Sequence, residues 1–178
     1  MVREQPALSV VEGFSLRDKA ALVIGASGPI GRAIAVALAE AGADVAVSTT
    51  TRSQREEVAA NSCANEVWAL DRKGFAQAID AASESDVQAL VERAVAELGR
   101  LDVLVNAHDL PYAKPFPEVT PEEWRRVLDV NLTGVYLACH AASGPMLSQG
   151  AGRIINVVSL LAERGMARVI AGKGMPWV

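Results

Sequence analysis

Residues 20–41 read AALVIGASGPIGRAIAVALAEA, which joins a short apolar run, a glycine-rich turn and a helical pattern. Glycines recur there at intervals of three. One can close the strand in a tight turn, one can let a phosphate approach the backbone, and one can let helix and strand pack closely. The helix start adds unpaired N–H groups and a positive dipole end. The pattern predicts a dinucleotide cradle, rather than a purely structural turn, made by Gly25, Ser27, Gly28, Pro29, Ile30 and Gly31.

The composition narrows the class of protein. The 178 residues are 51% hydrophobic, which suits one well-packed domain better than two. A net charge of -4, without a run of lysine or arginine, argues against nucleic acid or an anionic membrane as the main partner. Charges interrupt every long apolar stretch, so we expect no transmembrane helix. Cys63 and Cys139 lie far apart and, with two histidines, show no metal-ligand spacing. We therefore expect a cytoplasmic protein without a bound metal.

Short β-type runs alternate with helical patterns along the chain. Apolar residues repeat at helical spacing over 30–41 and 87–98. A third helix begins at Thr120, with Pro121 at its first position and Glu123 completing the capping box. Helices of this length between strands imply right-handed crossovers and a parallel sheet buried on both faces. The predicted strands are Ala20–Ile24, Asp44–Ser48, Ala76–Asp80, Asp102–Asn106 and Arg153–Ser159.

Other boundaries are less clearly marked. Ser85 and Gln88 predict a capping box at the start of the second helix. The segment 49–75 is the least regular, and we expect Trp68 and Leu70 to pack at the edge of the sheet. The predicted organisation is an N-terminal arm (1–14), a dinucleotide-binding domain (15–166) and an atypical C-terminal tail (167–178).

Five separate stretches resemble one known family, in its order and close to its spacing. They are GASGPIG at 25–31, Asp80 before a helix, LDVLVNA at 101–107, DVNLTGVYLA at 129–138 and GRIINVVS at 152–159. The chain is similar in these segments to the short-chain dehydrogenase/reductase family. The resemblance implies an α/β fold with a Rossmann-like, doubly wound parallel sheet flanked by helices. It also implies a nicotinamide cofactor and hydride transfer between a hydroxyl and a carbonyl by Ser, Tyr and Lys.

The resemblance assigns cofactor-binding roles after two strands. It implies that Asp80, with the adjacent Ala81, binds the adenine amino group, although Asp80 could instead be a solvated strand end. Asn106 and Ala107 match a pair beside the cofactor ribose. The chain departs from the family there, because His108 replaces a glycine and adds bulk where backbone passes close to the cofactor.

Two polar residues match the catalytic part of the family. Ser159 ends the fifth predicted strand and matches the catalytic serine, which hydrogen-bonds the substrate oxygen. Asn131 lies on an otherwise apolar helical face, where a buried amide requires hydrogen bonds. In the family this asparagine helps to hold an active-site water and the lysine; the alternative is a satisfied core amide. The apolar face is formed by Trp124, Leu128, Val135 and Ala138.

The residues after the second strand bear on the choice of cofactor. An acid there would bind the ribose 2′-hydroxyl and repel a 2′-phosphate. The sequence from Ser48 to Arg52 holds hydroxyl groups and a guanidinium but no acid. Since these groups suit phosphate, the sequence favours NADP(H) over NAD(H). The alternative is an ordinary polar turn.

The catalytic Tyr and Lys of the family are missing from their expected positions, which are Gly172 and Pro176. The resemblance stops after about Met166, as in a truncated or frameshifted member or a genuine short form. The fifth strand would then be an unprotected sheet edge. We expect an oxidoreductase fold with impaired catalysis; the alternatives are a non-catalytic NADP(H)-binding or interaction protein and an inactive fragment. The resemblance also implies homo-oligomers formed through the helix that carries Asn131.

Overall fold

Five parallel strands form a sheet with the order β3-β2-β1-β4-β5. The computed structural model describes residues 13–112 and 114–158. All four strand pairings are parallel, and β1 and β2 are buried almost throughout. Burial on both faces explains why these strands are nearly continuous runs of apolar residues. The strands are β1 (Ala20–Ile24), β2 (Asp44–Ser48), β3 (Ala76–Gln77), β4 (Val103–Asn106) and β5 (Arg153–Asn156).

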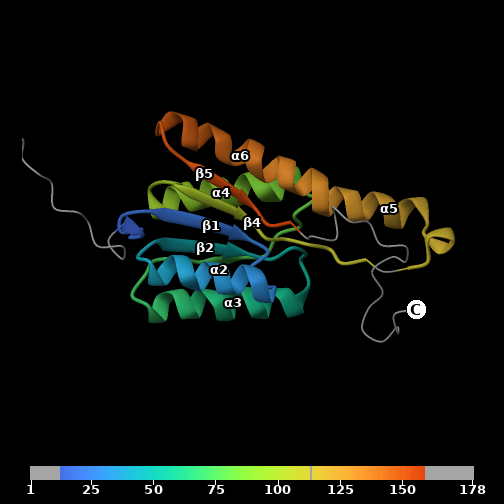
Figure 1. Ribbon diagram of the computed structural model, residues 1–178, viewed down its shortest axis with the longest axis horizontal. Helices are drawn as coiled ribbons and strands as arrows, with labels where there is room; N and C mark the ends of the chain where they lie inside the picture. Colours follow the sequence, from blue (N-terminus) through green and yellow to red (C-terminus); the bar gives the residue numbers. More distant parts are fainter. Residues whose placement is uncertain (1–12, 113, 159–178) are drawn as a thin grey trace, which may run out of the picture.

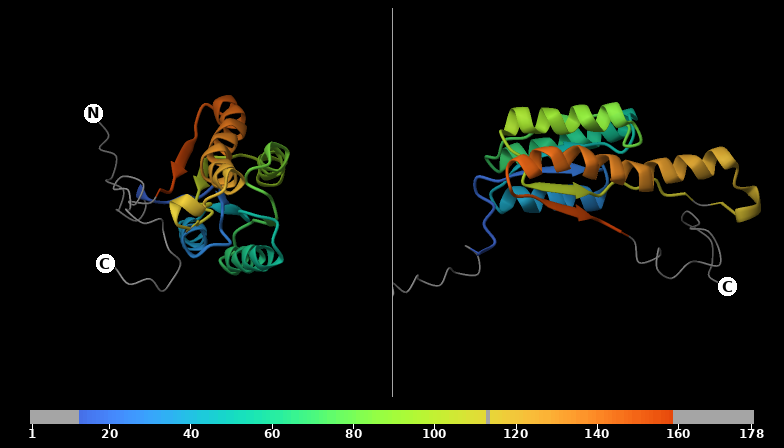
Figure 2. Two further views of the ribbon diagram at one scale, coloured as in Figure 1. Left: turned by 90° about the vertical axis from the view of Figure 1, so that its right-hand side faces the viewer. Right: turned by 90° about the horizontal axis from the view of Figure 1, so that it is seen from above.

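Helices cover both faces of the sheet (Figure 1). Helices α2 (Pro29–Glu40) and α3 (Gln54–Ala69) pack on one face, and α4 (Glu84–Leu98) and α6 (Gly134–Ser148) pack on the other. Helix α5 (Pro121–Leu128) follows the short 3-10 turn η1 (Phe116–Glu118) and runs into α6 through the π-helical turn η2 (Asp129–Thr133). Figure 2 shows α5 extending past the carboxyl ends of the strands. The predicted doubly wound, Rossmann-like sheet is confirmed.

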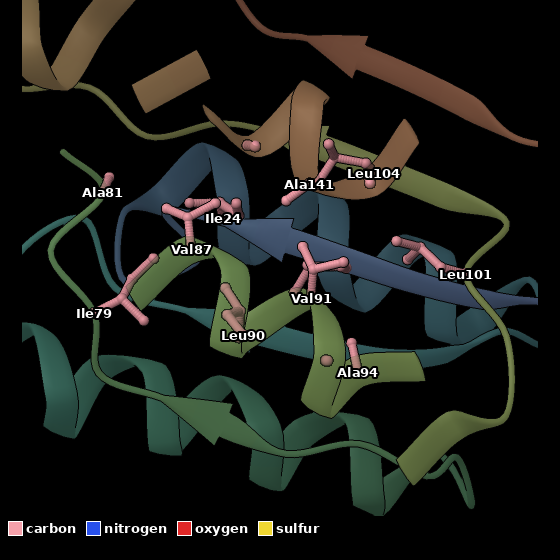
Figure 3. Packing of buried hydrophobic residues seen from close by; sticks show 14 of the residues in the cluster. Ile24, Ile79, Ala81, Val87, Leu90, Val91, Ala94, Leu101, Leu104 and Ala141 are labelled. Carbon is pink, nitrogen blue, oxygen red and sulfur yellow. The ribbon is translucent and has the colours of Figure 1, made fainter. Parts of the chain in front are cut away.

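The core consists of two apolar layers, one on each side of the sheet. In the layer below α2 and α3, the side chains are mostly alanine and valine. The side chains of the other layer, below α4 and α6, are larger. Figure 3 shows this layer, in which α4 contributes Val87, Leu90 and Val91. They pack with Ile24 of β1 and Leu104 of β4. Because β1, β2 and β4 are parallel and paired in register, the loops that follow them lie together at the carboxyl end of the sheet.

Several helix boundaries carry clear end signals. Gly28 is the N-cap of α2 and Pro29 is its first residue. Thr120 and Glu123 form the predicted capping box at α5. Helix α4 ends at Gly99, whose φ of 80° is in the left-handed region.

Two helix predictions were wrong. Helix α4 is capped by Ser83, whose hydroxyl accepts from the Asp86 N–H, and not by Ser85. The segment expected to be irregular forms α3 over sixteen residues. Trp68 lies near its end and is 55% exposed, but its indole N–H donates to the Gly74 carbonyl at 2.8 Å, just before the edge strand β3. Leu70 is 37% exposed. The side chains that α3 does bury are small or narrow, which explains why they gave no clear apolar stripe: they are Ala60, Cys63, Ala64 and Val67.

The predicted third strand is too long at its C-terminal end. The Thr49 hydroxyl donates to the Ile79 carbonyl at 3.0 Å and accepts from the Ile79 N–H at 2.9 Å. A side chain therefore satisfies both backbone groups of Ile79, and β3 ends at Gln77. Asp80 consequently lies in a loop rather than at a strand end.

The other strand predictions are closer. Strands β1 and β2 have the predicted bounds, and β4 begins one residue late. Asp102, expected in that strand, uses its carboxylate to accept from the Ala20 N–H at 3.0 Å. The described part of β5 stops at Asn156, and this strand lies at the edge of the described sheet with Ile154 and Ile155 about half exposed. In the part of the chain that the structure describes, no helix is long and apolar enough to cross a membrane.

Close packing at the start of α6 gives a test of the fold. A Cβ on Gly134 would lie 2.7 Å from the Ala81 carbonyl oxygen and 3.1 Å from Nε2 of His108. Because backbone cannot move aside cheaply, we expect Gly134→Ala to lower the free energy of unfolding by about 1–3 kcal/mol. Urea denaturation, followed by circular dichroism, measures this free energy of unfolding.

The matched control is Thr133→Ala, one residue earlier. Thr133 is exposed and its side chain caps no helix. The expected change is within about 0.5 kcal/mol. Equal effects of the two substitutions would contradict the packing described for Gly134.

Candidate functional site

The turn after β1 is built from backbone groups in close contact. Gly25 has a φ of 86°, a conformation that favours glycine. The N–H groups of Gly25 and Ala26 both donate to the Ser48 carbonyl, at 3.1 and 2.9 Å. A Cβ on Gly25 would lie 2.5 Å from both N and Cα of His108. Gly25 therefore lets the ends of β1, β2 and β4 meet.

The other two glycines of the turn differ in their packing. A Cβ on Gly31 would lie 2.4 Å from the Gly25 carbonyl oxygen, so this glycine allows α2 to pack directly on the turn. A Cβ on Gly28 would make only an ordinary contact, 3.5 Å from the same oxygen. Packing alone does not require glycine at Gly28, whereas it does at Gly31. A glycine at position 28 leaves space above the helix start.

The N-terminus of α2 is suited to an anion. Its N-cap, Gly28, provides no side-chain hydrogen bond, and no acid occupies the first turn of the helix. The predicted cradle residues Pro29 and Ile30 are exposed there, Ile30 at 61%. Helix N–H groups without a cap and a positive dipole end together favour a phosphate group. In a sheet of this order, the position is the switch point between β1 and β4, where open α/β folds bind ligands.

Ser27 links this turn to the end of β2 through Glu56. The Ser27 hydroxyl donates to the Glu56 carboxylate at 3.0 Å, and the same carboxylate accepts from the backbone N–H groups of Thr50 and Thr51 at 2.7 and 3.0 Å. Burial alone would raise the pKa of Glu56, but these bonds and one from the Thr51 hydroxyl outweigh it and hold that pKa below its usual range.

Arg52, predicted to bind a phosphate, has an acidic partner. Its guanidinium makes two hydrogen bonds of 2.8 Å to the Asp86 carboxylate. Hydrogen bonding to Arg52 is the largest influence on Asp86 and lowers its pKa. Arg52 is largely exposed, so a ligand could reach it. Because its guanidinium is bonded to Asp86, that ligand would compete with the Asp86 carboxylate.

Asp80 is also paired. Its carboxylate accepts from the Arg126 guanidinium at 3.1 and 3.2 Å and from the Ala82 N–H at 3.0 Å. The neighbouring Ala81 is buried and donates its N–H to the Thr50 carbonyl. The structure thus brings Asp80 and Ala81 beside the end of β2, and Asp80 is neither free nor simply solvated.

The end of β4 carries buried polar atoms without partners. Asn106 is 2% exposed, and its Nδ2 donates to Asn156 at 2.8 Å, while Oδ1 has no partner among the described residues. Ala107 donates its N–H to the Ile24 carbonyl. His108 is 6% exposed, and neither ring nitrogen is hydrogen-bonded within the described chain. Buried polar atoms of this kind call for a partner, such as a polar ligand group.

Asn131 supports the loop after β4. Its Oδ1 accepts from the Leu110 N–H at 2.8 Å, and its Nδ2 donates to the Leu110 carbonyl at 3.2 Å. It lies in the π-helical turn η2, a distortion often found at functional sites. The expected apolar face is only partly correct, because Trp124 is 53% exposed. Asn131 is thus a satisfied amide that fixes the loop, and not an isolated polar group in the core.

Some predicted positions lie outside the described residues: Ser159, and the expected tyrosine and lysine positions at Gly172 and Pro176. Among the described residues, burial and the nearby Glu123 carboxylate raise the pKa of Tyr112 to about 12, which makes it a poor proton donor. In residues 13–112 and 114–158, no group of three or more His, Cys, Asp or Glu side chains is arranged to hold a metal ion.

These observations define a class of protein: a parallel α/β domain with a glycine-rich turn and an uncapped helix N-terminus at its switch point. A family model described as short chain dehydrogenase matches residues 19–171. D-threitol dehydrogenase of Mycolicibacterium smegmatis is 36% identical over 167 residues, covering 92% of this chain and 61% of that protein. The chain therefore belongs to the short-chain dehydrogenase/reductase family, and it spans about three fifths of this relative.

Solved structures agree with this assignment. The crystal structure of NAD+-bound xylitol dehydrogenase superposes with a TM-score of 0.79 at 30% identity, covering 86% of this chain and 58% of that one. A blue fluorescent protein from a metagenomic library, in complex with NADPH, gives a TM-score of 0.78 at 36% identity, covering 87% and 62%. Related structures thus hold either nicotinamide dinucleotide.

Sequence reasoning missed Glu56 altogether. A signal was present, because Ser53 and Glu56 have the spacing of a capping box. Ser53 does cap α3, but the Glu56 carboxylate bonds instead to Thr50, Thr51 and Ser27. The pattern would have predicted the helix, though not this contact.

The burial of His108 predicts a specific pH dependence. Burial is the dominant influence on His108 and lowers its pKa. The His108 imidazole therefore takes up a proton less readily in the folded protein than in the unfolded chain. The stabilisation is complete above the unfolded pKa of about 6.5 and is lost as pH falls, by at most about 1.4 kcal/mol per pH unit. Urea denaturation at pH 7.5 and 5.5 should show a smaller loss in His108→Gln than in the wild type.

The exposed His140 provides the control. Carboxylates affect the wild type and both variants alike, so a difference between His108→Gln and His140→Gln is assigned to His108. A His108→Gln variant with the same pH dependence as the wild type would show that His108 titrates normally.

Proposed function

We propose that this chain binds a nicotinamide dinucleotide at the turn after β1 and belongs to an oxidoreductase that interconverts a carbonyl and an alcohol. The observation that carries the proposal is the backbone cradle: Gly25 and Gly31 have no room for a side chain, and α2 presents an uncapped N-terminus there. The pyrophosphate would bind Ser27, Gly28 and the first turn of α2. The bound cofactor would supply or accept the hydride.

Residues on the other side of the cradle would hold the rest of the cofactor. The unpartnered Oδ1 of Asn106 fits a ribose hydroxyl, and Ala107 lies beside it. Asp80 would bind the adenine amino group together with Ala81, which requires its carboxylate to share or leave Arg126. These assignments fit the groups present, and they follow the family resemblance.

We propose that hydride transfer is impaired, because Gly172 and Pro176 stand at the positions expected for the catalytic tyrosine and lysine. Ser159 would bind the substrate oxygen, and Asn131 would act as a positioning residue through the loop at Leu110. Glycine and proline stand where the family has its tyrosine and lysine, and neither can transfer a proton. Because these positions lack the proton-transfer groups, a non-catalytic NADP(H)-binding or interaction protein is the second candidate, and an inactive fragment is the third.

We also propose a preference for NADP(H), which the sequence suggested. Arg52 and the hydroxyl groups of Thr50 and Thr51 follow β2, where the 2′ group of the adenosine ribose binds in such folds. A 2′-phosphate would have to draw Arg52 away from Asp86. The preference for NADP(H) thus requires Arg52 to exchange the Asp86 carboxylate for the 2′-phosphate.

Two further properties belong to the proposal. A cytoplasmic location is supported by the cysteines, since Cys63 and Cys139 are both free thiols. Self-association through the α5–α6 segment is supported by large apolar side chains exposed there, at Trp124, Leu132 and Tyr136.

Titration and turnover test the function together. We expect the wild type to bind NADPH, with enhanced nucleotide fluorescence, and to show no oxidation of NADPH above background across a panel of ketones and aldehydes. Arg52→Gln should weaken binding of NADPH by about tenfold, since it removes a charged hydrogen-bonding partner, and leave NADH within about twofold. Arg55→Gln, an exposed neighbour in α3, is the control.

The outcomes separate the candidates. Failure to bind either dinucleotide would rule out the proposed function and the non-catalytic cofactor-binding protein. Turnover of a carbonyl substrate would contradict the impairment.

A further inference from the structure

The Glu56 carboxylate is held by four hydrogen bonds from neutral donors. Its Oε2 accepts from the Ser27 hydroxyl at 3.0 Å and from the N–H groups of Thr50 and Thr51 at 2.7 and 3.0 Å. Its Oε1 accepts from the Thr51 hydroxyl at 2.8 Å. We call these four donors the anion seat. They come from two segments far apart in sequence, the glycine turn and the loop after β2.

The carboxylate has no positive partner in the part of the chain that the structure describes. None of the ion pairs formed by residues 13–112 and 114–158 includes Glu56. The nearby Arg52 is bonded to Asp86, and Arg32 to Glu66. The negative charge therefore rests on backbone and hydroxyl dipoles alone, an arrangement that binds anions generally rather than one particular side chain.

The anion seat lies where the two nicotinamide cofactors differ. In sheets of this order the 2′ group of the adenosine ribose binds at the end of the second strand, beside the glycine turn. Thr50 and Thr51 follow β2, and Ser27 belongs to the turn. A 2′-phosphate bound at this corner would require the same N–H and hydroxyl donors that Glu56 occupies. A 2′-hydroxyl carries no charge and can itself donate to a carboxylate.

We propose that Glu56 is a specificity-determining residue, an internal anion that occupies the seat of a 2′-phosphate and so reduces the affinity for NADP(H) relative to NAD(H). This inference rests on the proposed binding of a nicotinamide dinucleotide. NADP(H) binds only after the carboxylate leaves the anion seat, whereas NAD(H) binds with the carboxylate in place. Arg52 and Glu56 thus act in opposite directions on the same choice.

Sequence reasoning does not identify Glu56 as a specificity residue, because it lies eight positions after the end of β2, in the first turn of α3. An acid directly after Ser48 would predict a ribose ligand, and its absence there predicts a preference for NADP(H). In the folded chain, Glu56 of the following helix places a carboxylate beside the end of β2.

The test compares Glu56→Gln with Glu57→Gln in the full chain. Glu57 is the exposed neighbour of Glu56 in the same helical turn, so its substitution controls for net charge and for the helix dipole. Fluorescence titrations with NADPH and with NADH give both affinities for each protein. We expect Glu56→Gln to raise the affinity for NADPH by about tenfold, with NADH and both affinities of Glu57→Gln within about twofold of the wild type. Thermal denaturation establishes that each variant is folded.

The outcomes distinguish this inference from the function on which it rests. If the wild type binds NADH and the ratio of the two affinities is unchanged in Glu56→Gln, Glu56 is no discriminator and the inference is overturned. If the wild type binds neither dinucleotide, the proposed function fails and this inference with it.

A measurement on the wild type covers the case in which Glu56→Gln does not fold. Amide resonances of Thr50 and Thr51 should shift on saturation with 2′,5′-ADP, which displaces the carboxylate, and much less with ADP. Equal shifts with the two nucleotides would overturn the inference.

Discussion

Backbone contact at Gly25 is the constraint on which the rest of this structure depends. A side chain there would collide with the backbone of His108, and a side chain at Gly31 would collide with Gly25 itself. Because both positions are glycine, β1, β4 and α2 approach one another closely. That approach leaves the N-terminus of α2 facing the switch point of the sheet, with an exposed start and no cap. The candidate site is therefore a consequence of how the first β–α unit packs.

Near the glycine turn and the end of β2, the charged side chains of Arg52, Asp80 and Glu56 already have partners within the chain. Arg52 is bonded to Asp86, and Asp80 to Arg126. Glu56 occupies backbone donors between the glycine turn and β2. A ligand that carries phosphate would therefore exchange partners rather than fill an unpaired site. Such exchange makes affinity depend on small differences between competing contacts, which is how selectivity between similar ligands is commonly obtained.

Much of the fold could be predicted from local signals, while the site could be predicted only in part. Strands β1 and β2 are apolar runs with clear ends, and the capping box at Thr120 marks α5 directly. Helix α3 was missed because it buries small side chains such as Ala60 and Ala64. The sequence indicated the glycine cradle, since its spacing is local. The partners of Arg52, Asp80 and Glu56 are long-range contacts or departures from a local motif, and no sequence pattern specified them.

The most direct test of the central claim is a crystal structure of the full chain with NADPH bound. The account predicts that the pyrophosphate lies over Gly28, in contact with the backbone N–H groups at the start of α2, and that the adenosine ribose lies beside Thr50 and Thr51. A dinucleotide bound elsewhere on the molecule, or a pyrophosphate away from residues 25–31, would contradict it.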